Sequence, residues 1–496
     1  MPCSPFSGIV PQDAKSTIEA LASEPQSQSL SMAEAAFRRA YPLYESTREI
    51  DALRAAEYPA LDANSQVYLD YTGGGLYAQC QVREHQERLA GHIFGNPHSR
   101  SPASLASTGL VERTRQKVLE FFNAPPEEYV AVFTANASTA LKLVGEAYPF
   151  DAGDHYLLTF DNHNSVNGIR EFARARGARI TYAPLALPDM RVDEGRLRES
   201  WKTLAGGENR LFAYPAQSNF SGVQHPLEWI PEAQQLGWDV LLDAAAFVPT
   251  NRLDLSRWRP DFVPLSFYKM FGYPTGVGCL LARRKALKKL HRPWFSGGTI
   301  TVASVQGDRF YMAEGSAAFE DGTADYLNIP GVEIGLRHLG SVGIDKIHER
   351  CRCLAGWLID ELLALHHANG KPLVRIYGPA STEGRGGTVT MNFYDPHGAV
   401  IDHLHIEEEA ARNNISLRTG CFCNPGGGEI ALQLSKTELI GCFNQPHIEA
   451  SHRFTPDDFR LCVDGKSTGA VRVSLGIASN FADVYRFVHF VRRFLR

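Results

Sequence analysis

Short apolar runs alternate with stretches of helical spacing along residues 131–243, and this alternation constrains the fold more than any other feature of the chain. A strand, a helix and a second strand in that order are typical of parallel sheets covered by helices on both faces. The predicted strands are AVFT (131–134), HYLLTF (155–160), RITYAP (179–184), RLFAYP (210–215) and the run that ends at Asp243. The sequence therefore predicts an α/β fold built on a mainly parallel sheet.

The flanking regions suggest how the rest of the chain is organised. Residues 1–30 are rich in Ser, Pro, Gln and Ala and are expected to be a mobile tail. Residues 31–94 are predicted to form a helical segment that joins a smaller domain. The large domain is predicted over 95–345, with a helix expected at 300–318, and 346–496 is expected to form the smaller α+β domain.

Composition argues against several classes of function. The 496 residues are 44% hydrophobic and 21% charged, with a formal net charge of −5, so no basic surface for nucleic acid is expected. No apolar run reaches the length of a membrane span, and the first residues lack the pattern of a secretory signal. Nine cysteines form no regular framework, which leads us to expect reduced thiols and a cytoplasmic location.

Lys269 lies in an apolar setting, between Phe267 and Phe271 and just before a Gly/Pro-rich turn at 272–276. Burying a charged lysine is costly, so its pKa would fall and its amine would become a usable nucleophile. A Schiff base with pyridoxal phosphate requires such an amine. The competing interpretation is a surface lysine on a strand–turn–strand hairpin, and Lys269 alone does not exclude it.

Asp243 stands at the carboxyl end of a predicted strand, where open α/β sheets bind their ligands. An aspartate there can keep a pyridine nitrogen protonated and so make the ring an electron sink. The alternative is that Asp243 caps a helix that begins at Ala244. Asp243 followed by Lys269 in the next strand–loop unit favours one pyridoxal site.

Three other strand ends carry polar side chains, each with two interpretations. Ala137 and Ser138 open a helix whose N-terminus can bind phosphate, or they belong to an ordinary helix cap. His163 can stack on an aromatic ring and move protons, or it can be structural. Asn219 can contact a ring oxygen, or it can form a turn.

The segment ISLRTGCFCNPGGG (415–428) places Arg418, Cys421 and Cys423 beside a run of glycines, and we call residues 421–428 the cysteine loop. It belongs to the predicted small domain. No ligands follow at the spacing of a zinc finger, so no metal site is predicted. A disulfide between the two cysteines has poor geometry. The remaining interpretation is a nucleophilic thiol on a mobile glycine loop.

Five ordered motifs resemble the class V, fold-type I pyridoxal enzymes: GNPHS, LLDAAAF, SFYKMFGYPTGVG, SLRTGCFCNPG and GAVRVSLG. Within them, the chain is most similar to the cysteine desulfurase domain of eukaryotic molybdenum cofactor sulfurases, from about Tyr68 to the C-terminus. The resemblance implies a large domain that binds pyridoxal 5'-phosphate, a smaller C-terminal domain, and a homodimer with active sites at the subunit interface. The chain ends at Arg496, before the further C-terminal domain of those sulfurases.

The resemblance also implies roles for individual residues. Lys269 would bond the cofactor, Asp243 would pair with the pyridine nitrogen, and His163 would stack on the ring. Asn219 would lie near the ring oxygen. The remaining cofactor contacts match Ala137, Ser138, Ser266, Tyr268 (a histidine in bacterial desulfurases) and Thr323, which the other subunit would lend.

The function implied is that of an L-cysteine desulfurase, whose substrate is a small molecule, an amino acid. Cys423 matches the cysteine that takes the sulfur and becomes a persulfide, which leaves alanine. Arg418 and Arg472 match residues that bind the substrate carboxylate, a task that suits the arginine fork. The alternative is a lyase, or a decarboxylative enzyme that forms a C–C bond, acting on an amino acid in a secondary-metabolite pathway. Retention of Cys423 favours the desulfurase, whose sulfur acceptor the sequence does not identify.

Overall fold

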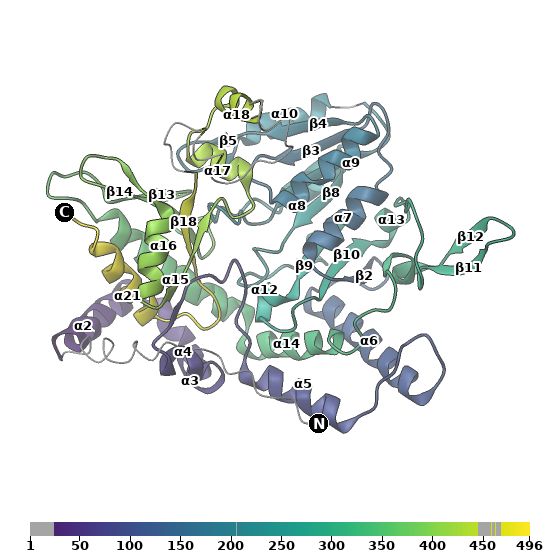
Figure 1. The fold of residues 1–496 in the computed structure, drawn as a ribbon, viewed down its shortest axis with the longest axis horizontal. Coiled ribbons are helices and arrows are strands. Elements are labelled where there is room, and N and C mark those ends of the chain that lie inside the picture. Colours follow the sequence, from purple (N-terminus) through teal and green to yellow (C-terminus); the bar gives the residue numbers. More distant parts are fainter. Residues whose placement is uncertain (1–23, 205, 445–457, 459–461, 463–467) are drawn as a thin grey trace.

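The computed structural model describes residues 24–496 except 205, 445–457, 459–461 and 463–467 (Figure 1). A seven-stranded sheet lies at its centre, with the order β2-β10-β9-β8-β7-β3-β4. Neighbours from β9 to β4 run parallel, whereas β10 is antiparallel to β2 and β9, so the predicted mainly parallel sheet is confirmed. The strands are β2 (Tyr129–Thr134), β3 (His155–Thr159), β4 (Arg179–Ala183), β7 (Arg210–Pro215), β8 (Asp239–Asp243), β9 (Phe262–Ser266) and β10 (Gly278–Arg283).

Helices cover both faces of this sheet, because successive side chains of a strand point to opposite sides. In β3, Tyr156 and Leu158 pack in one core cluster with helix residues such as Ile169, while Leu157 lies in the other cluster. The first face carries α7 (Ala137–Ala147) and α9 (Ile169–Ala175). The second carries α6 (Pro102–Phe121), α10 (Glu194–Thr203), α11 (Trp229–Gln235) and α14 (Ile329–Val342).

A second, smaller sheet is built from the C-terminal part of the chain and is antiparallel throughout. Its strands are β13 (Val374–Tyr377), β14 (Thr388–Tyr394), β15 (Val400–Ile401), β17 (Arg418–Gly420) and β18 (Ala470–Ser474). Helices α15 (Ile344–Leu363), α16 (His403–Arg412) and α21 (Phe481–Arg492) belong to the same part of the chain. The α+β character expected for this region is therefore present.

The N-terminal segment packs on this C-terminal unit (Figure 1). β1 (Val67–Tyr68) pairs in parallel with β16 (Ile415–Ser416), so residues distant in the sequence share a two-stranded sheet. The other elements that pack there are α2 (Glu24–Ala40), a 3-10 helix (Pro42–Thr47), α3 (Glu49–Glu57) and α4 (Pro59–Ala63). The following helix, α5 (Gln79–Gly91), packs against α14 instead. Because α2 begins at Glu24, part of the expected tail is helical, and residues 1–23 lie outside the described ones.

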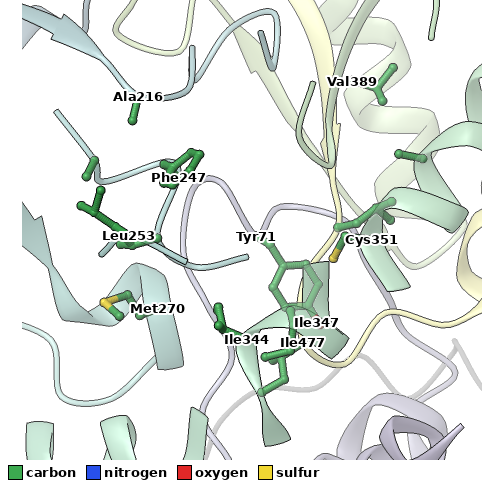
Figure 2. Close-up of a cluster of buried hydrophobic side chains, with 14 of the residues drawn as sticks. Tyr71, Ala216, Phe247, Leu253, Met270, Ile344, Ile347, Cys351, Val389 and Ile477 are labelled. Atoms are coloured by element: carbon green, nitrogen blue, oxygen red, sulfur yellow. The ribbon is translucent and has the colours of Figure 1, made fainter. Parts of the chain in front are cut away.

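One hydrophobic cluster joins the large sheet to the C-terminal unit. Figure 2 shows Met270 from the large-sheet region, Ile344 and Ile347 of α15, and Tyr71 of the N-terminal segment in this cluster. All four side chains are buried. The two sheets therefore share a continuous core, which fixes their relative position at the site described below.

The helix expected at 300–318 is wrong. The segment forms a hairpin, β11 (Ile300–Ser304) and β12 (Arg309–Met312), followed by a 3-10 helix at Gly315–Phe319. β-Branched Thr301 and Val302 favour a strand, and Gly307 lies in the turn, so local propensity explains the hairpin. The hairpin projects from the body of the molecule (Figure 1), and we call residues 300–312 the arm.

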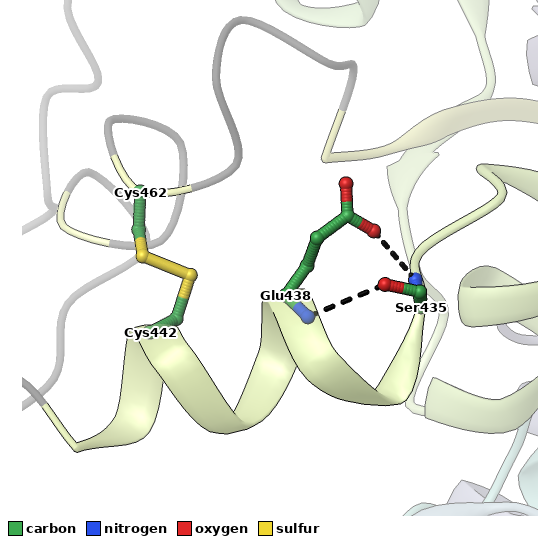
Figure 3. The surroundings of a disulfide bond; sticks show 4 residues. All are labelled: Ser435, Glu438, Cys442 and Cys462. Carbon is green, nitrogen blue, oxygen red and sulfur yellow. Dashed lines mark hydrogen bonds between the residues drawn. A yellow bond between two sulfur atoms is a disulfide. The ribbon is translucent and has the colours of Figure 1, made fainter.

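The expectation that every thiol is reduced is wrong for one pair. Cys442, near the end of α18 (Lys436–Phe443), forms a disulfide with Cys462 (Figure 3). Their Cα atoms are 5.7 Å apart, which suits a disulfide, but the two residues are 20 positions apart in the sequence and nothing in their spacing indicated a pair. In the part of the chain that the structure describes, no helix is long and apolar enough to cross a membrane.

Candidate active site

A cavity of about 220 Å³ opens where the carboxyl ends of β3, β7, β8 and β9 meet. This is the edge at which open α/β sheets bind ligands. Eight residues singled out from the sequence line it: Ala137, Ser138, His163, Asn219, Asp243, Ser266, Tyr268 and Lys269. The structure thus brings together side chains spread over more than a hundred positions of the chain.

Lys269 is carried by a short helix, α12 (Phe267–Phe271), between β9 and β10, and not by a hairpin turn. Among the described residues no hydrogen bond or ion pair is found for its amine. Burial lowers the pKa of Lys269, and the nearby Asp243 carboxylate opposes part of that shift. A lower pKa increases the share of the neutral, nucleophilic amine. Because Lys269 lines the cavity, the surface-lysine interpretation is excluded.

Asp243 ends β8 and points its carboxylate to the same cavity. Its Oδ1 accepts a hydrogen bond from the Ala245 amide at 3.0 Å, and residues 245–250 form turns, so Asp243 does not cap a helix. His163 caps α8 (Asn164–Asn167), with Nδ1 accepting from the Ser165 amide at 3.1 Å. Nδ1 as acceptor leaves the hydrogen on Nε2, and burial lowers the pKa of His163, which keeps the ring neutral.

The opposite end of the cavity is the start of α7. Asn136 caps this helix, its Oδ1 accepting from the Thr139 amide at 2.9 Å, and the Ala137 amide donates to Ser266 Oγ at 2.9 Å. Ser138 Oγ lies 2.6 Å from Ser165 Oγ, and Ser165 is a neighbour that sequence reasoning missed. A helix N-terminus with hydroxyls around it suits a phosphate group.

These features fit pyridoxal 5'-phosphate as a set. The cavity offers an amine of lowered pKa in Lys269, a carboxylate in Asp243, a neutral imidazole in His163 and an anion-binding helix start at Ala137. Each group matches a part of that cofactor: its aldehyde, its pyridine nitrogen, its ring and its phosphate. The residues present are therefore the ones that this cofactor requires.

The cysteine loop is hydrogen-bonded to residues at the cavity, and its glycines lie in a helix. Asn219 Nδ2 donates to the Phe422 carbonyl at 2.7 Å, and the Asn164 amide donates to the Cys423 carbonyl at 2.6 Å. The glycines form the first turn of α17 (Pro425–Ala431), where a β-carbon on Gly426 would overlap the carbonyl of Phe160. The run of glycines thus reflects close packing, which the sequence alone did not distinguish from flexibility.

The two thiols lie on either side of a buried side chain, that of Phe422. Phe422 packs against Phe220 and lies under the guanidinium of Arg472, 4.6 Å from its Cζ, whereas Cys421 and Cys423 are exposed. Phe422 and Cys423 have φ values of 57° and 56°, a conformation that costs energy for residues other than glycine. A negative charge on Cys423 would raise the pKa of Lys269 and of Arg472, so the thiol lies within electrostatic reach of both side chains.

Arg418 and Arg472 converge beside the cavity on an acid that the sequence analysis did not single out. Arg418 Nη2 donates to Asp70 at 2.6 Å and Arg472 Nη2 donates to it at 3.1 Å. The ion pair raises the pKa of Arg418, while burial lowers the pKa of Arg472 to about 10. Asp70 follows strand β1 and precedes Gly73, a signal in VYLDYTGGG that was available in the sequence.

Three consecutive carbonyls after β7 are bound by side chains of the C-terminal unit. Arg472 Nη1 donates to Asn219 O at 2.9 Å, Thr390 Oγ1 donates to Phe220 O at 2.6 Å, and Arg385 Nη2 donates to Ser221 O at 2.9 Å. Buried carbonyls of a loop need such donors. The C-terminal unit thereby fixes the loop that carries the Asn219 side chain.

Thr323 does not line the cavity of its own chain. Its side chain is exposed, and its Oγ1 accepts from Asn96 Nδ2 at 3.2 Å. The adjoining Gly322 amide donates to the Gly297 carbonyl at 2.8 Å, which ties this loop to the base of the arm. Its predicted contact with a phosphate therefore requires a second copy of the chain.

Comparisons with known proteins extend these observations. The family model described as Aminotransferase class-V matches residues 67–487. The chain is 38% identical over 483 residues to a molybdenum cofactor sulfurase of Solanum lycopersicum, across 91% of this chain and 58% of that protein. It is 37% identical over 467 residues to a molybdenum cofactor sulfurase of Homo sapiens, across 88% and 50%. The chain spans little more than half the length of these relatives.

Solved structures share the fold. An apo cysteine desulfurase from Thermococcus onnurineus NA1 superposes with a TM-score of 0.72 at 22% identity, covering 89% of this chain and 97% of that one. The cysteine desulfurase CsdA from Escherichia coli gives 0.69 at 21% identity, covering 90% and 98%. The family model spans most of the sequence, and the cavity presents the matching lysine, aspartate and histidine. The chain therefore belongs to the class V aminotransferase family, and this membership implies pyridoxal 5'-phosphate as its cofactor.

Proposed function

We propose that the protein is a pyridoxal phosphate-dependent L-cysteine desulfurase that transfers the substrate sulfur to Cys423. The observation that carries this proposal is the strained turn at Phe422 and Cys423, which presents an exposed thiol near Lys269. Unfavourable φ values of this kind persist where the surrounding contacts hold them, and they concentrate at functional sites. The relatives named molybdenum cofactor sulfurase and the desulfurases of known structure support the same reaction.

The cofactor would be held by groups at both ends of the cavity. Lys269 would bond it covalently, Asp243 would meet its pyridine nitrogen, and the start of α7 with Ser266 would receive its phosphate. When bound, pyridoxal phosphate supplies an electron sink for the substrate. Lys269 Nζ and His163 Nε2 are two groups at the cavity wall that can carry a proton, and burial lowers the pKa of both, which favours their neutral, proton-accepting forms.

Cys423 then has one task, which is to accept sulfur. Its thiolate attacks the sulfur of L-cysteine, a bond forms between the two sulfur atoms, and the bond between carbon and sulfur breaks. L-Cysteine and the Cys423 thiol are thereby converted to L-alanine and a Cys423 persulfide, with no outside oxidant or reductant. The hydrogen bonds from Asn164 and Asn219 to this turn hold the thiol in place.

We also propose that the working form is a homodimer in which Thr323 completes the partner's cofactor site. Thr323 is exposed and lies beside the base of the arm, whose Val305 side chain is 99% exposed and whose Phe310 and Tyr311 are also exposed. Exposed apolar side chains gathered on one element mark an interaction surface. Because the Thr323 loop is bonded to Gly297 at the base of the arm, a partner that covers the arm would also meet Thr323.

The reaction is tested by incubating the purified protein, loaded with cofactor, with L-cysteine in the absence of reductant. We expect one alanine per active site in the first turnover and a mass increase of one sulfur atom on the peptide that contains Cys423. Alanine formation without a modified Cys423 would contradict the proposed role of this thiol. Release of pyruvate or carbon dioxide in place of alanine would contradict the reaction itself.

A further inference from the structure

Asp70 occupies the space between the two arginines predicted to bind substrate. Arg418 donates to it from Nε at 3.0 Å and from Nη2 at 2.6 Å, both to Oδ2, and Arg472 Nη2 donates to Oδ1 at 3.1 Å. Both carboxylate oxygens are therefore taken by guanidinium groups. The Asp70 carboxylate thus occupies the position between the two guanidinium groups where a ligand carboxylate could otherwise bind.

The two arginines are not equivalent in this cluster. The Arg418 side chain is 51% exposed and gives its Nε–Nη2 edge to Asp70. The Arg472 side chain is 2% exposed, and its Nε is a buried donor without a partner among the described residues. A buried N–H without an acceptor costs free energy, so an acceptor that reaches Arg472 Nε gains a hydrogen bond, whereas Arg418 Nε already donates to Asp70.

The backbone keeps Asp70 in this position. Asp70 forms a β-bridge with Ser474, and the Ser474 amide donates to the Leu69 carbonyl at 2.7 Å. A β-carbon on Gly73 would stand 2.5 Å from Asp70 Oδ2 and 2.7 Å from Arg418 Nη2, so glycine is required there for the ion pair to close. The backbone on which Asp70 stands is therefore held by strand contacts, and the lack of a side chain at Gly73 leaves room for the ion pair.

The charges of the cluster suggest what it admits. Two guanidinium groups and one carboxylate leave one positive charge, which one ligand carboxylate would balance. A second acidic group on the ligand would meet Asp70 as a like charge, and unfavourable contacts of this kind are an effective means of specificity.

We propose that Asp70 is a specificity-determining residue that occupies Arg418 and leaves Arg472 as the receptor for a single carboxylate. The site then takes amino acids with one carboxylate and rejects those with a second acidic group on the side chain. This inference rests on the proposed function only in requiring an amino acid as ligand. It does not depend on sulfur transfer.

L-Alanine and L-aspartate test the inference, because they differ by one carboxylate. Their dissociation constants are measured on the cofactor-loaded protein from the change in cofactor absorbance. We expect the unaltered protein to prefer alanine. We expect Asp70→Asn to shift the ratio of the two constants toward aspartate by about tenfold or more, since tenfold corresponds to about 1.4 kcal/mol. The double variant Asp70→Asn with Arg418→Gln should lose that shift, because the freed arginine is then absent.

Two measurements separate specificity from a structural effect. Asp345→Asn removes a carboxylate from an exposed ion pair with Arg252, and it should leave the ratio unchanged. In the unaltered protein, L-asparagine should bind more tightly than L-aspartate. This comparison needs no variant, so it tests the inference even if Asp70→Asn does not fold. Equal binding of asparagine and aspartate, or an equal loss of affinity for both amino acids in Asp70→Asn, would overturn the inference. A failure to release alanine from L-cysteine would instead count against the desulfurase alone.

Discussion

Gly335 of α14 lies against the ring of Phe271, two residues after Lys269, so closely that a β-carbon on Gly335 would overlap atoms of the ring. Phe271 ends the short helix that carries Lys269. The long helix α14 therefore sets the position of the lysine from behind, at a distance that only glycine allows.

Gly335→Ala should destabilise the protein by about 1–3 kcal/mol, because the Phe271 ring has to move in a packed core. Gly340→Ala is the matched control on the same helix, where a β-carbon meets nothing within 4 Å. We expect the control to gain up to about 1 kcal/mol from helix propensity. Urea denaturation measures both, and equal stability of the two variants would contradict the packing described here.

Lys269 should be the lysine that bonds the cofactor. Reduction of the loaded protein with borohydride should attach the cofactor to the peptide that contains Lys269, as mass spectrometry would show. Lys269→Ala should abolish this attachment, whereas Lys285→Ala, at an exposed lysine beyond β10, should leave it intact. A tag on any other lysine would remove the basis of the proposed site.

The rate at which the protein captures its cofactor should rise with pH, with a midpoint that Asp243 influences. The neutral amine of Lys269 is the reactive form, and its pKa lies below the usual 10.5 because of burial, so the capture rate should rise with pH and level off below that value. The Asp243 carboxylate raises this pKa, so Asp243→Asn should move the midpoint to lower pH. Asp239→Asn, at the other end of β8, serves as the control. A midpoint that moves upward in Asp243→Asn would contradict the electrostatic account.

The two thiols of the cysteine loop should differ in function. Cys423→Ala should abolish alanine release from L-cysteine, since the sulfur then has no acceptor, while the absorbance of the bound cofactor stays unchanged. Cys421→Ala should retain most of the activity, because Cys423 is the thiol whose backbone is bonded to Asn164 at the cavity wall and whose charge acts on the pKa of Lys269. Single-turnover measurements of alanine distinguish the two, and full activity in Cys423→Ala would exclude a persulfide on this residue.

Complementation between subunits tests the dimer. Lys269→Ala lacks the bonding lysine, and Thr323→Ala lacks the group that we expect to be lent across the interface. A mixed dimer of the two variants contains one site with both residues intact, so mixing should restore cofactor binding to part of the protein. Light scattering should show a dimer for each variant. If mixing restores nothing although dimers form, Thr323 acts within its own chain or not at the site.

The strand ends were predictable because the carboxyl ends of neighbouring parallel strands meet at one edge. That rule placed Asp243 at the ligand-binding edge, and the family resemblance added Ser138, His163 and Asn219, which line the same cavity in the structure. The individual roles of these residues stay predictions. What the sequence conveyed reliably was their common location.

The features that were missed depend on contacts between distant parts of the chain. The position of Asp70 between a strand and a glycine turn was visible in the sequence, but its partners lie 348 and 402 positions further along, so no spacing rule indicated the ion pairs. The glycines at 426–428 resemble a flexible loop by composition, yet the structure packs them against Phe160 and Phe220. The helix expected at 300–318 gave no weight to the strand propensity of Thr301 and Val302, which the arm follows.

Asp70 and its two arginines are far apart in the sequence, which affects the order in which the parts of the site form during synthesis. The cavity walls from Asn136 to Lys269 are synthesised well before Arg418 and Arg472, which complete the ion pairs with Asp70. Domains tend to fold as they emerge during synthesis, whereas contacts between distant segments form late. If the proposed roles hold, a nascent chain contains the residues for its cofactor before the residues that select the amino acid can meet.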